Sequence, residues 1–136
     1  MKYEFEVIGD IVGKERPRVN MYTGRVYTPE KTKDYEFYIQ QCFKMKYPAY
    51  ETLKGRVKID IVAYLKIPKS TSKTKMQDML DEKISPTKKP DVDNIAKSIL
   101  DAMNKFIIED DTQVSKISIE KKYALEEKVR IIVEEY

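Results

Sequence analysis

The stretch "KKPDVDNIAKSILDAMN", residues 88–104, combines a helical pattern with a dense group of charged side chains. Its apolar residues recur every three or four positions, which is the spacing of one face of an α-helix. We expect the buried stripe to consist of Val92, Ile95, Ala96, Ile99, Leu100 and Met103. Asp93, Lys97 and Asp101 then share the opposite, exposed side. The stretch therefore predicts an amphipathic helix.

Alternating apolar and charged residues predict strands on both sides of this helix. The clearest are "KYEFEVIGDIV" near the N-terminus and "RVKIDIVAYLKI", residues 56–67. A third strand is built on Val114, Ile117 and Ile119. Strands toward both ends with helices between them favour an α+β fold, in which helices pack against a mixed β-sheet.

Two shorter patterns fill the N-terminal part. In "RVNMYTGRVYT", Thr23 and Gly24 lie between two short runs of Val and Tyr, which predicts a hairpin. Thr28 and Pro29 resemble a helix start, with Thr28 at the N-cap and Pro29 at the first helical position. We expect that helix to run to about Met45.

No break in composition divides the chain, so we expect one domain over residues 1–136. Residues 66–90 form a basic, partly flexible insert, in which "SKTKMQDMLDEK" has the spacing of a short helix. No apolar run is long enough to span a bilayer, and the first residues lack a signal-peptide pattern. We therefore expect a cytoplasmic protein without a membrane partner.

The sequence contains no histidine and one cysteine, Cys42. The commonest general base and the commonest transition-metal ligand are thus absent. Catalysis would have to use carboxylates, Lys, Tyr or a hard cation such as Mg²⁺, Mn²⁺ or Ca²⁺. Cys42 alone forms no internal disulfide, and we interpret it as core filling.

Charge is distributed unevenly along the chain. Residues 13–33 carry six basic and two acidic side chains, and residues 66–90 carry seven and three, so each segment has a net charge of +4. Residues 91–136 carry seven basic and eleven acidic side chains, a net charge of −4. Solvated loops can have such runs. Basic segments beside an acidic one also suit a nuclease, because the basic side chains neutralise phosphates while carboxylates hold a metal.

The first acidic pair allows two interpretations. Asp91 could cap the helix while Asp93 and Lys97 form a weak surface ion pair. Alternatively, both carboxylates could bind a cation. A second group, Glu109, Asp110 and Asp111, favours the latter, because we expect the chain to return these acids to the start of the helix at Asp91. Carboxylates from two segments would then converge on one hard cation.

These two motifs also resemble a known family. "KPDVDNIAKSILDAMN" followed by "EDDTQV" is similar to the D-x-D-N-x-x-K and D-D-x-Q signature of the RusA family of Holliday junction resolvases. "GKERPRVNMYTGRVYTPEKTKDYE" also resembles the opening of phage-type and Gram-positive members. The resemblance touches both ends and the middle of the chain.

The resemblance implies roles for individual residues. Asp91, Asp93 and Asp111 would be the essential metal-binding carboxylates, Asp110 an additional metal ligand, and Lys97 the lysine of the catalytic site. The family also implies a homodimer and products with 5′-phosphate and 3′-hydroxyl ends. From the charge pattern, we expect the DNA backbone to contact Arg16, Arg18, Lys73, Lys75, Lys88 and Lys89.

Together these features predict a Mg²⁺-dependent endodeoxyribonuclease, with Mn²⁺ as a substitute metal, that resolves four-way junction DNA by paired nicks. Two alternatives remain open. One is a junction-binding protein that does not cleave, and the other is a nuclease that prefers flaps or replication forks.

Overall fold

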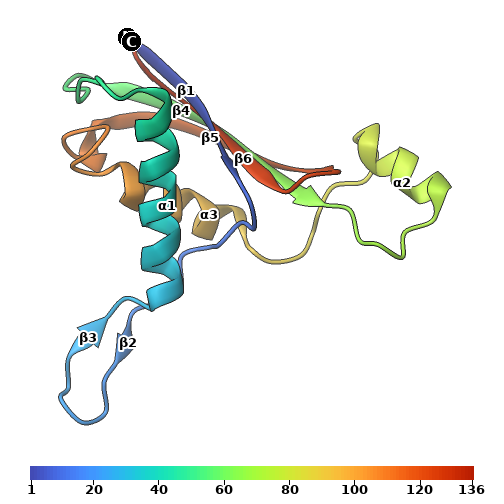
Figure 1. The fold of residues 1–136 in the computed structure, drawn as a ribbon, viewed down its shortest axis with the longest axis horizontal. Helices are drawn as coiled ribbons and strands as arrows, with labels where there is room; N and C mark the ends of the chain where they lie inside the picture. Colours follow the sequence, from blue (N-terminus) through green and yellow to red (C-terminus); the bar gives the residue numbers. More distant parts are fainter.

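A computed structural model describes residues 1–136 and contains a four-stranded mixed sheet (Figure 1). The spatial order is β1-β6-β4-β5. β4 pairs parallel with β5, and the other two pairings are antiparallel. The strands are β1 (Lys2–Ile8), β4 (Val57–Lys66), β5 (Val114–Ala124) and β6 (Lys128–Glu135). The expected α+β fold with a mixed sheet is thus confirmed.

Three α-helices accompany the sheet: α1 (Glu30–Lys46), α2 (Lys73–Leu80) and α3 (Val92–Met103). α1 and α3 pack against each other and cover one face of the sheet, whereas α2 stands apart beyond one end of it (Figure 1). A two-stranded hairpin, β2 (Arg18–Val19) and β3 (Val26–Tyr27), projects below α1. The hairpin was predicted from the turn at Thr23 and Gly24.

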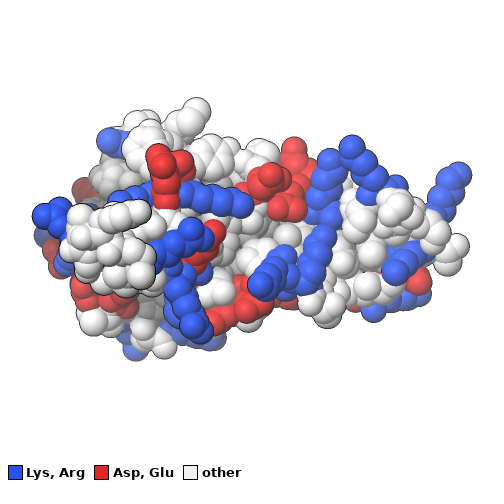
Figure 2. All heavy atoms as spheres, turned by 90° about the horizontal axis from the view of Figure 1, so that it is seen from below, with Lys and Arg blue, Asp and Glu red and all other residues white.

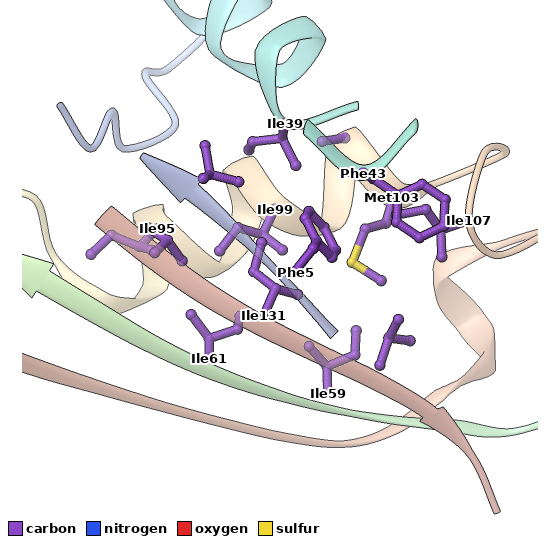
Figure 3. Packing of buried hydrophobic residues seen from close by; sticks show 14 of the residues in the cluster. Phe5, Ile39, Phe43, Ile59, Ile61, Ile95, Ile99, Met103, Ile107 and Ile131 are labelled. Carbon is purple, nitrogen blue, oxygen red and sulfur yellow. The ribbon is translucent and has the colours of Figure 1, made fainter. Parts of the chain in front are cut away.

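The core lies between the sheet and the two helices (Figure 3). Every second residue of β4 is buried, and so is every second residue of β1 from Tyr3 to Val7. This period of two places one set of side chains on the helix-covered face. Phe5, Ile59 and Ile131 meet Ile99 and Met103 of α3 there (Figure 3).

The buried face of α3 is rotated slightly from the predicted one. Ile95, Ile99 and Met103 are fully buried as expected, and Ala96 and Leu100 are partly buried. Val92 was wrongly placed in the stripe, since 43% of it is exposed. Ser98 and Ala102 are buried instead. Ser98 Oγ donates to the carbonyl of Val12 in the segment before α1, and Gln40 of α1 donates to the carbonyl of Ala102.

The N-terminus of α1 begins one residue later than predicted. Pro29 occupies the N-cap position, and its carbonyl accepts hydrogen bonds from the amides of Thr32 and Lys33. Thr28 therefore lies outside the helix and does not cap it. A proline at this position loses nothing by lacking an amide hydrogen, because the first amides of a helix have no internal partner.

β1 is an edge strand, and tyrosines bond to some of its outward backbone groups. Tyr47 Oη donates to the carbonyl of Glu4 and accepts from its amide, both at 3.1 Å. Tyr38 Oη donates to the carbonyl of Ile8 at 2.6 Å. Both tyrosines belong to α1 or its C-cap, so the helix protects the edge of the sheet beside it.

The basic segment 66–90 contains the predicted short helix. Ser72 caps α2 by accepting a hydrogen bond from the amide of Lys75. Met79 is buried, and Glu82 forms an ion pair with Lys122 of β5 at 2.6 Å. α2 is thus attached to the edge strand β5. None of the helices is long and apolar enough to cross a membrane.

Candidate nuclease site

A polar cleft of about 660 Å³ lies beside the N-terminal half of α3. One wall is α3 and the other is the extended segment that leads into the hairpin. No hydrophobic side chain lines the cleft, which suits a charged ligand. The lining residues are Lys14, Glu15, Arg16, Pro17, Asp91, Asp93, Asn94, Lys97 and Asp101.

Asp91 and Asp93 open into this cleft with uncommitted carboxylates. Asp91 occupies the N-cap position of α3, yet its side chain accepts no capping hydrogen bond. Asp93 lies in the first turn, and neither residue forms an ion pair. Asp91 thus occupies the predicted cap position without a side-chain capping bond, and the Asp93–Lys97 ion pair does not form. The two carboxylates remain available for a cation.

Lys97 follows Asp93 by one helical turn and faces the same cleft. Its side chain is exposed and forms no ion pair within the chain. Arg16, a predicted DNA contact, lines the cleft as well. Of the four predicted catalytic residues the structure brings together three, namely Asp91, Asp93 and Lys97. All three are positioned by one helix.

Lys14 is a cleft residue that the motifs did not single out. Its Nζ lies 2.9 Å from Glu36 Oε1 on α1 and 2.9 Å from Asp101 Oδ2 on α3. Partial burial would lower the pKa of the Lys14 ammonium, but its hydrogen bonds to both carboxylates outweigh burial and raise the pKa. The lysine stays charged and ties the two helices together. The only sequence feature that could have indicated Lys14 is its position in the first basic segment, residues 13–33.

The two walls of the cleft approach each other closely at Gly13. The amide of Lys14 donates to the carbonyl of Asn94 at 2.9 Å. A Cβ added to Gly13 would lie 2.8 Å from Pro90 Cβ and 3.1 Å from Asn94 Cβ. Glycine at this position therefore sets the distance between the hairpin segment and the start of α3.

The second acidic group lies at the opposite end of α3. The amide of Asp111 donates to Oδ1 of Asn104, the C-cap of the helix, at 3.1 Å. A helix of twelve residues is about 18 Å long, and Asp91 is at its other end. The expectation that these acids return to the start of the helix is wrong within one chain. No group of three acidic residues there is close enough to hold a metal ion.

The two neighbouring acids differ in their surroundings. Asp110 caps the short 3₁₀ helix η1 (Asp111–Gln113), accepting from the amide of Thr112 at 3.1 Å. Hydrogen bonds from Thr112, helped by Lys105, lower the pKa of the Asp110 carboxyl. The side chain of Asp111 accepts no hydrogen bond and is exposed.

Lys121, rather than the acids, returns to the start of α3. β5 begins after η1 and runs back along the sheet beside β4. Lys121 Nζ donates to the carbonyl of Lys88 at 2.6 Å and to that of Pro90 at 3.1 Å. These bonds fix the loop that leads into Asp91, which makes Lys121 a positioning residue that the sequence patterns did not indicate.

The six predicted DNA contacts are all exposed, on three separate parts of the chain. Arg16 and Arg18 belong to the segment that enters the hairpin, and Arg18 pairs with Glu15 at 3.2 Å. Lys73 and Lys75 lie on the first turn of α2, and Lys88 and Lys89 precede Asp91. Figure 2 shows basic side chains on both sides of a central acidic region. Basic side chains of this kind can neutralise phosphates.

The model of the endodeoxyribonuclease RusA family matches residues 9–134. This match covers nearly the whole chain and includes both acidic motifs.

The chain belongs to the RusA family of endodeoxyribonucleases. The chain is also 36% identical over 137 residues to YqaN of Bacillus subtilis (strain 168), an uncharacterized protein. That alignment covers 97% of this chain and 95% of YqaN. Family membership supports an assignment of the chain as a nuclease, a hydrolase of DNA.

Proposed function

We propose that this RusA-family protein is a Mg²⁺-dependent, structure-selective endodeoxyribonuclease that resolves four-way DNA junctions by paired nicks. One observation carries the proposal. Asp91 and Asp93 present uncommitted carboxylates to a polar cleft, with Lys97 beside them and basic segments on both sides. These features suit a nuclease, because carboxylates hold a metal at the phosphate and basic side chains neutralise the neighbouring phosphates.

The donor atoms fit a hard divalent cation. Mg²⁺ is usually held by one or two carboxylates together with water and substrate phosphate, which matches an open pair such as Asp91 and Asp93. Mn²⁺ accepts the same oxygen ligands. When bound, the metal would lower the pKa of a water molecule and polarise the scissile phosphate.

The side chains of the cleft have separate tasks. Lys97 is placed one turn from Asp93, where its ammonium can stabilise the negative charge that develops on the phosphate. Lys14 is held by Glu36 and Asp101, so it maintains the shape of the cleft. Lys88, Lys89 and Arg16 would contact the neighbouring phosphates and hold the strand across the acids.

Asp111 enters the proposal through a second copy of the chain. Within one copy it lies one helix length from Asp93. In a symmetric homodimer every contact between the copies occurs twice, so an Asp111 that lies beside the Asp91–Asp93 pair of the other copy would complete two equivalent sites. Such a dimer also supplies the two sites that paired nicks require. Asp110 would act as a cap that holds η1 in place.

The decisive experiment compares cleavage of a synthetic four-way junction, a replication fork, a flap and a linear duplex at one salt concentration with Mg²⁺. We expect the junction to be cut fastest, by two symmetric nicks. Asp93→Asn should abolish cutting and retain binding, whereas Asp34→Asn, an exposed and unpaired acid of α1, should behave like the wild type.

Other outcomes would select the alternatives. Faster cutting of the fork or flap would identify a nuclease of different preference. Binding without cleavage in either Mg²⁺ or Mn²⁺ would indicate an architectural protein. Undiminished cutting by Asp93→Asn would refute the assignment of the site.

A further inference from the structure

The hairpin forms an arm, here residues 18–27, that stands away from the rest of the protein (Figure 1). It begins directly after Arg16 and Pro17, which line the cleft. Any DNA strand held in the cleft therefore passes next to the base of the arm.

The tip of the arm carries two of the most exposed large apolar side chains of the protein. Tyr22 is 99% exposed and Met21 is 90% exposed. Val19, Val26 and Tyr27 of the same arm are exposed as well. An apolar group of this kind on a projecting element commonly marks a binding surface.

The tip is held in a defined conformation without packing against the body. Asn20 Oδ1 accepts from the amides of Tyr22 and Thr23 at 2.9 and 3.2 Å. The amide of Asn20 donates to the carbonyl of Arg25, and that of Gly24 donates to the carbonyl of Asn20, both at 2.8 Å. The turn thus presents Met21 and Tyr22 outward and reduces the entropy lost when they bind.

The charge of the arm indicates which partner it binds. Arg18 and Arg25 lie within the arm, which contains no acid, and Arg16 lies at its base. Glu15, before the arm, pairs with Arg18, and Glu30 follows the arm as the first residue of α1. An apolar tip between arginines repels a second basic arm but suits nucleic acid, because the arginines contact phosphates while aromatic and thioether groups contact bases.

We propose that the tip, Met21 and Tyr22, inserts at the branch point of a DNA junction and stacks on the bases there. The proposal rests on the junction-directed function above and names the structural feature that the arm recognises. In a continuous duplex each base is covered by its neighbours, whereas a branch point whose helices are unstacked leaves base faces accessible. Stacking on an aromatic side chain tolerates any sequence, since every base has a π-face.

The test uses Asp93→Asn protein, so that binding is measured without cleavage. The DNA junction carries the fluorescent base 2-aminopurine either at the branch point or in the middle of one of its duplexes. The affinity of the protein for the junction and for a linear duplex is measured by fluorescence anisotropy. The added variants are Tyr22→Ala, Tyr22→Phe and, as a matched apolar control, Met45→Ala at the far end of α1, where Met45 is 83% exposed.

We expect 2-aminopurine at the branch point to change its fluorescence when the protein binds, and 2-aminopurine in the middle of a duplex to remain unchanged. Tyr22→Ala should abolish that change and weaken junction binding by about tenfold, with duplex binding unchanged. Tyr22→Phe should restore both signals, because the ring is retained, and Met45→Ala should have no effect.

Three results for Tyr22→Ala would overturn the inference. They are unchanged affinity for the junction, an equal loss of affinity for junction and duplex, and dissociation of the dimer into monomers in the absence of DNA. The last would show that the tip binds a second copy. The readout is separate from catalysis. If wild-type protein with Mg²⁺ cuts no junction while the branch signal depends on Tyr22, the proposed function fails and the tip assignment stands.

Discussion

Gly13 touches Pro90 so closely that a methyl group on the glycine would lie 2.8 Å from Pro90 Cβ. The contact joins the segment that leads into the hairpin to the residue that precedes Asp91. The position of the metal-binding candidate thus depends on the absence of a side chain at residue 13.

Gly13→Ala should therefore disturb both stability and activity. Overpacking a tight contact costs about 1–3 kcal/mol of unfolding free energy, and the displaced Pro90 would move Asp91. Denaturant titration and junction cleavage measure the two effects. Gly55→Ala is the control, because the added Cβ would meet only the end of the Glu135 side chain at 3.1 Å. Equal stability of the two variants would contradict the prediction.

A mixing experiment can locate the third carboxylate. Asp93→Asn and Asp111→Asn should each be inactive alone. If Asp111 acts across the dimer, a mixed dimer has one damaged site with both substitutions and one intact site. An equal mixture after subunit exchange should then recover roughly a quarter of the wild-type sites. Nicking of a labelled junction measures the recovery.

The same mixture also tests the opposite arrangement. If all three carboxylates came from one chain, each site of the mixed dimer would lack one of them and no activity would return. Mixing Asp93→Asn with Asp91→Asn provides the control, since both substitutions damage the same half of the site and recovery is not expected.

The salt dependence of binding should report the role of α2. Each phosphate neutralised on duplex DNA contributes about 0.9 to the slope of log affinity against log salt. Lys73→Ala combined with Lys75→Ala should therefore reduce the magnitude of the slope by roughly 1.8. Lys44→Ala combined with Lys54→Ala removes two exposed lysines outside the basic segments and should leave the slope unchanged. Equal slopes for all three proteins would exclude α2 from the interface.

Asp110 should contribute a pH-dependent part of the stability. Hydrogen bonds from Thr112 lower the pKa of its carboxyl in the folded protein, so the contribution is present above the ordinary value of 3.8. It is lost as the pH falls through the lower folded-state pKa. Asp110→Asn should thus lower Tm at pH 7, and its difference from the wild type should shrink below pH 4. A constant difference across that range would show that the charge is irrelevant.

Periodicity was a good guide to elements that bury one face. Alternation in β1 and β4 and the spacing of Ile95, Ile99 and Met103 correspond to the observed core. The rotation of the α3 face was not predictable, because it depends on contacts with the segment near Val12 and with α1. Single-domain organisation and the roles of the individual site residues stay predictions.

The location of the second acidic group shows where spacing stops being informative. The chain turns sharply after α3 because Ile107 and Ile108 are buried and the amide of Leu53 donates to the carbonyl of Ile107. That anchorage keeps Asp110 and Asp111 near the C-terminal end of the helix. β5 then carries Lys121 back to the loop before Asp91. The spacing of residues along the sequence does not show which of the two, the acidic group or Lys121, lies beside the start of α3.

The tyrosines along β1 have a consequence for assembly. An incoming strand would have to displace Tyr47 from both backbone groups of Glu4 and Tyr38 from the carbonyl of Ile8. Unpaired strand edges are where protein chains add to one another without limit. By ending the sheet at β1, α1 leaves β5 as the other edge of the sheet and so restricts the ways in which two copies can associate through their strands.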